Sequence, residues 1–339
     1  MASSDHLAKF QSAPRAYAAG LLRLPGRASV CPLCGSPDTG GAFTDNGCSL
    51  HVCNICDLFF VDPYPASMQQ HQQVSSGAYR EIEILDCARR YQGERLFYDR
   101  HFALIAKEVQ GATSLLDVGC GTGNLLERLA AQPHLDRAGI ELNAQAARFA
   151  RKTAGCKIFE VPIEEFHSGR QFDVITMINV FSHIPSFDGL FQSLHAALRP
   201  GGKLILRTSE MARNVSRWNQ VHWGIPDDLH FLGLRSLDFL CAQYGFAVAR
   251  HLRTPFEDEL FRRSRWEQMG RSRVRNLIKA AGTHIPLALP ALKQLYTAAL
   301  GQRLFISFIV LIPLAASTKA CGAKVAHLRA QKEWSQSES

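Results

Sequence analysis

The stretch LLDVGCGTGNLL at residues 115–126 decides the fold of this 339-residue chain. An apolar strand runs into three glycines spaced every second residue, and a helical pattern begins directly after them. Glycines in such a loop allow the backbone to approach a ligand closely. Asn124 and Leu126 stand at the two possible sixth positions of G-x-G-x-x-G, and no Gly-Lys-Ser/Thr follows. The loop therefore argues against both a dinucleotide and a phosphate-cradled nucleotide as its ligand.

The charge beside this loop indicates what the ligand is instead. Asp117 stands at the tip of the strand, where its carboxylate attracts a ligand with a positive end and no phosphate. S-adenosylmethionine fits that description. Glu141 ends the next predicted strand, where an acidic side chain is able to accept both ribose hydroxyls of a nucleoside. The two carboxylates together predict S-adenosylmethionine as the cofactor.

Strands and helices alternate along residues 112–254. Short apolar runs alternate with stretches of helical spacing, an order typical of a parallel sheet covered by helices on both faces. We expect strands at 114–118, 137–141, 172–180, 203–207 and 246–252, and helices at 124–131, 144–153, 190–198 and 236–244. The predicted fold class is α/β, doubly wound.

Four short segments together closely resemble the class I S-adenosylmethionine-dependent methyltransferases. They are Asp117-x-Gly-x-Gly-x-Gly, Gly139-Ile-Glu141, Phe172-Asp173-Val-Ile and Leu198-Arg-Pro-Gly-Gly-Lys-Leu204, and the resemblance covers about residues 110–252. It implies a Rossmann-like, seven-stranded sheet with the cofactor across the carboxyl ends of the first, second and fourth strands. It also implies a last, antiparallel strand at 304–311.

Cofactor contacts carry over from the family to nine positions. Asp117, Gly119, Gly121 and Gly123 are expected at the methionine end, Glu141 at the ribose, Asn143, Ile163 and Glu164 at the ribose or adenine, and Asn179 at the end of the fourth strand. The sequence departs from the family at Ile163, where an acidic residue is commoner, and this weakens the adenine assignment of Glu164.

Two C-x-x-C pairs, Cys31/Cys34 and Cys53/Cys56, lie 18 residues apart near the start of the chain. This spacing predicts a four-cysteine zinc ribbon in a reducing compartment, and four thiolates leave no open position for catalysis. Cys48 and His51 are less suitable as ligands. The stretch 53–65 also resembles the ribbon that precedes the methyltransferase domain in bacterial small-molecule methyltransferases, among them sugar C-methyltransferases.

Three histidines are candidates to remove a proton from the methyl acceptor. His230 and His222 lie in a connection with two tryptophans that follows the fifth predicted strand, and His183 comes shortly after the fourth. Histidine is the usual general base near neutral pH. We prefer His230 and His222 over His183, and a packed or solvated loop histidine remains the alternative for each.

The chain divides into a main domain with smaller units at both ends. We expect a flexible leader (1–30), the zinc ribbon (31–66), a helical lead-in (67–111), the methyltransferase domain (112–254), a basic helical insert (255–302), the last strand (303–316) and a polar tail (317–339). No apolar run reaches the roughly 20 residues of a transmembrane helix. We therefore expect a cytoplasmic protein whose insert acts either as a lid over the acceptor or as a peripheral membrane contact.

The leading interpretation is a methyltransferase of a small-molecule or carrier-linked biosynthetic metabolite. A net charge of +8 and a zinc ribbon also suit RNA methylation. However, the basic residues concentrate in the late insert and not beside the ribbon, which makes nucleic acid the weaker interpretation. A non-catalytic cofactor-binding adaptor is the third possibility, which the intact loop and Glu141 disfavour.

Overall fold

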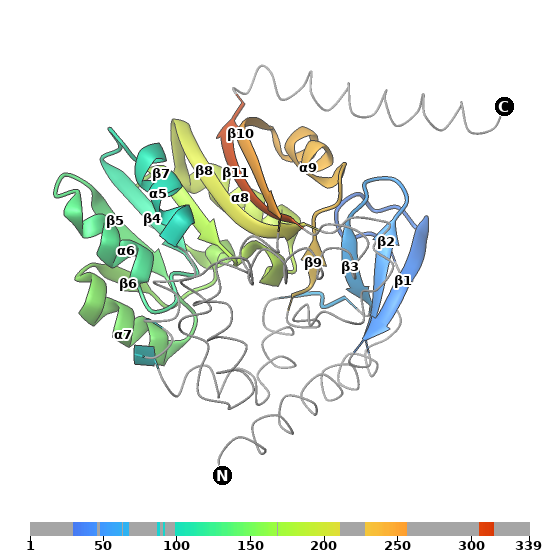
Figure 1. Ribbon diagram of the computed structural model, residues 1–339, viewed down its shortest axis with the longest axis horizontal. Helices are drawn as coiled ribbons and strands as arrows, with labels where there is room; N and C mark the ends of the chain where they lie inside the picture. Colours follow the sequence, from blue (N-terminus) through green and yellow to red (C-terminus); the bar gives the residue numbers. More distant parts are fainter. Residues whose placement is uncertain are drawn as a thin grey trace, which may run out of the picture.

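The computed structural model describes residues 30–45, 48–62, 64–67, 87–88, 91, 99–167, 169–210, 228–255 and 305–314. These residues form a seven-stranded sheet and a separate four-stranded sheet (Figure 1). The strands of the larger sheet are β4 (Ser114–Val118), β5 (Asp136–Ile140), β6 (Lys157–Phe159), β7 (Phe172–Ile178), β8 (Leu198–Glu210), β10 (Phe246–Pro255) and β11 (Phe305–Pro313). Their order is β10-β11-β8-β7-β4-β5-β6, and β11 runs antiparallel to the other six strands. The predicted doubly wound α/β fold is confirmed.

Helices cover both faces of this sheet and create two apolar cores. The described helices are α5 (Asp99–Glu108), α6 (Asn124–Arg128), α7 (Ala144–Ala154), α8 (Phe187–Ala197) and α9 (Ser236–Tyr244), with 3-10 turns η1 (Leu129–Ala131), η2 (Ile163–Glu165) and η3 (Phe181–His183). Buried residues of α5, α6 and α7 pack on one face, and those of α8 and α9 pack on the other. Because β4, β5 and β7 are parallel neighbours, their carboxyl ends lie side by side at one end of the sheet, which we call the carboxyl edge.

The observed elements differ from the predicted ones mainly at their ends. Strand β6 was not predicted, because it is only three residues long and has no alternating pattern to mark it. Strand β8 begins at Leu198, earlier than expected, since the Arg-Pro-Gly-Gly stretch that reads as a turn already continues the strand. The last strand is antiparallel, as the family resemblance implied.

The four-stranded sheet combines three strands from the segment of the two cysteine pairs with one strand from the main domain. Its strands are β1 (Thr39–Asp45), β2 (Cys48–Cys53), β3 (Phe59–Asp62) and β9 (His230–Phe231), all antiparallel and in that order. We call residues 31–62 the cysteine ribbon. It lies beside α9 and β9 (Figure 1), and most of its buried residues belong to the same apolar core as α8 and α9. The sequence did not predict β9, so the ribbon is more closely joined to the main domain than expected.

Two long connections begin at the carboxyl edge: residues 211–227 after β8, and residues 256–304 between β10 and β11. Glu210 at the end of β8 pairs in register with Phe305 at the start of β11, and Phe305 also pairs with Pro255 at the end of β10. The predicted basic insert connects these last two strands. The insert, the leader before residue 30 and the tail after residue 314 lie outside the described residues. Among the helices that are described, none is both long enough and apolar enough to cross a membrane.

Candidate functional site

The glycine loop has the left-handed backbone that its sequence requires. Gly119, Gly121 and Gly123 all have positive φ, at 68°, 55° and 80°. A Cβ atom on Gly119 would also lie 2.3 Å from a methyl group of Val180. Only glycine meets both conditions without strain. The loop is thereby held close to the end of β7, at the carboxyl edge.

Asp117 lies on β4 just before the loop and is almost completely buried. Its Oδ1 accepts a 2.7 Å hydrogen bond from the hydroxyl of Thr176 on β7. This bond fixes the orientation of the carboxylate between two neighbouring strands. Segment 117–124 contains no lysine or arginine, so its charge suits a cationic ligand and not a phosphate.

Glu141 follows β5 directly, and two backbone amides hold its carboxylate. Gly121 donates to Oε2 at 2.9 Å, and Asn143 donates to Oε1 at 2.8 Å. A carboxylate offers about four lone-pair positions, so each oxygen retains capacity for a ribose hydroxyl. The glycine loop therefore helps to orient Glu141, the residue that was expected to bind ribose.

The other residues expected to contact adenine or ribose differ in their burial and in their hydrogen bonds. Asn143 caps α7, because its Oδ1 accepts from the amides of Gln145 and Ala146. Ile163 is buried in η2, and burial raises the pKa of the neighbouring Glu164. The Oε2 atom of Glu164 is buried and accepts no hydrogen bond from the described residues. Glu164 is thus the member of this set that has an uncommitted polar atom.

Asn179 directly follows β7 and has a left-handed conformation, with φ of 60°. Its backbone amide donates to the backbone carbonyl of Arg207 at 2.9 Å, and its side-chain Oδ1 accepts from the Arg207 guanidinium at 3.2 Å. Arg207 is only 2% exposed. A charged side chain so deeply buried at the carboxyl edge fixes the turn that leads to η3.

His183 ends η3 beside the carboxyl edge. Its Nε2 lies 3.6 Å from Oδ1 of Asp228, and the two side chains are 27% and 20% exposed. The hydroxyl of Ser182 also donates to Asp228 Oδ1. This is a half-buried imidazole beside a carboxylate, the arrangement that a general base needs.

His230 is fully buried, unlike His183. The rings of Phe181 and Phe187 lie 4.8 and 4.6 Å from its imidazole, and the Tyr64 hydroxyl is 3.0 Å from Nδ1. Burial, with a smaller contribution from His183, lowers the pKa of His230 to about 3. His222, the other preferred candidate, lies outside the described residues. The setting of His230 is therefore that of a neutral imidazole packed in a core.

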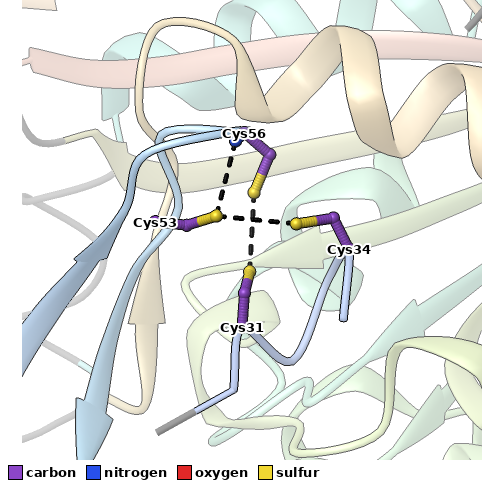
Figure 2. Close-up of side chains that lie close together, drawn as sticks. All are labelled: Cys31, Cys34, Cys53 and Cys56. Carbon is purple, nitrogen blue, oxygen red and sulfur yellow. Dashed lines mark hydrogen bonds between the residues drawn. The ribbon is translucent and has the colours of Figure 1, made fainter. Parts of the chain in front are cut away.

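The four predicted metal ligands converge on one point, as Figure 2 shows. The sulfur atoms of Cys31 and Cys56 are 3.5 Å apart, as are those of Cys34 and Cys53. All four lie within 4.8 Å of one another, and none is in a disulfide. Tetrahedral Zn–S bonds of about 2.3 Å place sulfurs about 3.8 Å apart. The spacing of the cluster fits that geometry, and His51 does not belong to it, while the side chain of Cys48 lies outside the described part of the chain.

Comparison with known proteins agrees with the cofactor site described above. The family described as a methyltransferase domain matches residues 80–251, half of the chain. The chain belongs to the class I S-adenosylmethionine-dependent methyltransferases.

Relatives of this methyltransferase include two proteins named ubiquinone biosynthesis O-methyltransferase. The one from Bordetella avium (strain 197N) is 32% identical over 31% of this chain and 45% of its own length. The one from Histophilus somni (strain 2336) is 32% identical over 40% of this chain and 61% of its own length. The chain thus spans about half the length of these curated relatives. A solved structure of Haemonchus contortus phospholethanolamine N-methyltransferase 2 has a TM-score of 0.52 at 16% identity, covers 76% of this chain and 63% of its own, and shows the shared fold.

The structure adds residues to the site of the methyltransferase that the sequence did not single out. Asp228 was missed because it pairs with His183 only across 45 residues of chain, and its neighbour Asp227 looks the same in sequence. Arg207 ends the predicted strand 203–207, and its pairing with Asn179 is not visible in the sequence. The signal that was available is a charged residue at the carboxyl end of an otherwise apolar run, which is costly unless it is paired.

Proposed function

We propose that this methyltransferase acts on a small-molecule or carrier-linked metabolite, with His183 as the base that removes the acceptor proton. The observation that carries the proposal is the His183–Asp228 pair, which lies at η3 in the connection that follows β7. In-line methyl transfer chiefly requires alignment and, for a protonated acceptor, a base within reach.

The cofactor site assigns a separate task to each of its residues. Glu141 binds the ribose hydroxyls, and Asp117 attracts the positively charged end. Gly119, Gly121 and Gly123 allow the backbone to approach the methionine portion. Asn143, Ile163 and Glu164 border the ribose or adenine, and Asn179 contacts the cofactor from the end of the fourth predicted strand. When bound, S-adenosylmethionine supplies an electrophilic methyl group on a sulfonium. The two carboxylates and the absence of basic residues from segment 117–124 support this assignment.

His183 replaces His230 as our preferred base for a physical reason. A base must reach solvent or acceptor and hold a proton near neutral pH. His183 is partly exposed and has a carboxylate partner that favours the protonated imidazole. His230 is 0% exposed, and its low pKa disfavours protonation. His222 remains a candidate on its sequence position alone.

The names of the relatives support a small acceptor with a hydroxyl group. Two of them are called ubiquinone biosynthesis O-methyltransferases. We therefore propose a partly apolar acceptor whose hydroxyl proton His183 takes up, as Asp228 stabilises the resulting imidazolium.

Transfer of a labelled methyl group from S-adenosylmethionine tests this proposal. The acceptors to be compared are catechol, a hydroquinone, a nucleotide-linked sugar and structured RNA. We expect at least one small molecule to be methylated, and His183→Gln to lower kcat about 10²–10⁴-fold with the cofactor Kd unchanged. His134→Gln, an exposed histidine remote from the pair, is the matched control. Methylation of RNA alone refutes the acceptor class, and full activity of His183→Gln refutes the base.

We further propose that the four cysteines bind one structural zinc ion. Residues Cys31, Cys34, Cys53 and Cys56 would close the coordination shell, so that zinc supplies folding energy and no chemistry. Metal analysis is expected to find one zinc per chain. The variant Cys56→Ser is expected to lose zinc and thermal stability more than cofactor affinity. A protein without zinc, or a stable Cys56→Ser variant that has lost only turnover, contradicts the proposal.

A further inference from the structure

We propose that the cysteine ribbon is a positioning element for the acceptor base, and that Leu229 connects the two. This inference rests on the proposed role of the His183–Asp228 pair. It gives the ribbon a part in methyl transfer.

The connection consists of backbone hydrogen bonds on both sides of one residue. Val61 of β3 donates its amide to the carbonyl of Leu229 at 2.9 Å. The amide of Leu229 in turn donates to the carbonyl of Ser182 at 2.8 Å. Leu229 is 0% exposed, so no water competes for either bond. The backbone at residue 229 is therefore held between the ribbon and the turn that carries His183.

Asp228 directly precedes this fixed residue. Its carboxylate contacts both Ser182, through the hydroxyl, and His183, through Nε2. A catalytic group must be held within about 0.5 Å of its productive position, which requires support from surrounding residues. Here the ribbon strand and η3 together determine where the backbone of Asp228 lies.

The ribbon end of the connection is anchored by the second cysteine knuckle. Cys53 donates its amide to the carbonyl of Leu58, which fixes the start of β3. Beyond the knuckle, Arg235 binds the Asp57 carboxylate with two nitrogens, at 2.9 and 3.2 Å. The Ser236 hydroxyl donates to the carbonyl of Cys56 at 2.9 Å. Any loosening of the knuckle is thus transmitted along β3 to Leu229.

A second contact joins the same elements one residue further on. His230 pairs in register with Phe60 of β3, and its imidazole is 3.0 Å from the Tyr64 hydroxyl. The burial of His230 is explained by this role, because a neutral imidazole surrounded by aromatic rings locks β9 onto the ribbon. His230, which the sequence predicted as a base, is thus a positioning residue that holds β9 against the ribbon.

Asp57→Asn tests the connection without touching a cysteine. Asparagine tolerates the left-handed conformation of residue 57, which has φ of 59°, but loses the charge that Arg235 binds. Asp136→Asn is the matched control. Asp136 is exposed at the start of β5, and this variant removes the charge that pairs with Arg170. Backbone amide exchange is read by NMR in the full chain.

We expect the Leu229 amide to exchange about tenfold faster in Asp57→Asn, together with that of Val61, while Leu116 and Ala138 in the central strands stay protected. A Leu229 amide that keeps its protection while Val61 exchanges faster overturns the connection. The same variant is expected to lower kcat for methylation of catechol with an unchanged cofactor Kd. That loss should disappear in an Asp228→Asn background, because the ribbon acts through Asp228. If Asp228→Asn itself turns over like the parent, the proposed base is wrong, whereas the exchange result still reports on the connection.

Discussion

Replacement of Glu141 gives the most direct test of the cofactor site. Its carboxylate accepts two backbone amides, from Gly121 and Asn143, before any ligand arrives. We expect Glu141→Ala to weaken S-adenosylmethionine binding by about 1.5–3 kcal/mol, the range for hydrogen bonds to a charged group. This corresponds to a Kd about 10–150 times higher.

The isosteric change Glu141→Gln sharpens the prediction. Both carboxylate oxygens face N–H donors, so one end of a glutamine amide would direct its NH₂ group at a donor. We therefore expect Glu141→Gln to be almost as damaging as Glu141→Ala, within about threefold in Kd. Asp136→Asn lies at the other end of the same strand and is expected to leave the Kd unchanged, since exposed ion pairs contribute little.

Titration calorimetry with S-adenosylmethionine and with S-adenosylhomocysteine measures these affinities, and thermal unfolding controls for loss of structure. A Glu141→Ala variant that binds within twofold of the parent refutes the ribose assignment. A Glu141→Gln variant that binds like the parent refutes the argument from the two amide donors.

Two further predictions concern the junction between the ribbon and the main domain. Because burial lowers the pKa of His230 to about 3, below its ordinary 6.5, its contribution to stability is complete above about pH 6.5 and declines as the pH falls towards 3. Between pH 7 and pH 5 the parent should lose about 2 kcal/mol more unfolding free energy than His230→Phe, and equal losses in denaturant titrations would contradict the buried neutral imidazole. A Cβ on Gly233 would lie 1.9 Å from the Asp57 carbonyl oxygen, so Gly233→Ala should lower stability by about 1–3 kcal/mol. Gly40→Ala, with its nearest neighbour 4.0 Å away, should change the melting temperature little, and similar melting temperatures for the two variants would show that the close approach carries no strain.

The local parts of the fold could be predicted from sequence because each is marked within a few residues. The glycine loop, the apolar strand before it and the helix of 236–244 all coincide with observed elements. The cysteine cluster was predictable for the same reason, since the ligand spacing is a local property. Strand β9 was not, because a two-residue strand is defined only by its partner, and that partner lies about 170 residues earlier in the chain.

The assignment of the histidines shows where sequence reasoning reaches its limit. His183 lies between Ser182 and Ile184, and His230 lies between Leu229 and Phe231. Neither local sequence tells which imidazole is buried. Burial and a carboxylate partner separate them clearly in the structure, but both depend on contacts between distant segments. Proximity in sequence identified the neighbourhood of the site, whereas the chemistry of each member required the tertiary structure.

The docking of the ribbon also has a consequence for the order in which the chain folds during synthesis. Its four cysteines are complete once residue 56 has been made, but the Ser236 hydroxyl that binds the Cys56 carbonyl comes 180 residues later. At roughly 5–20 residues per second, a ribosome needs about 10–35 s to make that stretch. Throughout this interval the apolar face of the ribbon has no α9 to cover it. Early capture of a metal ion would hold the nascent ribbon together until its partner emerges.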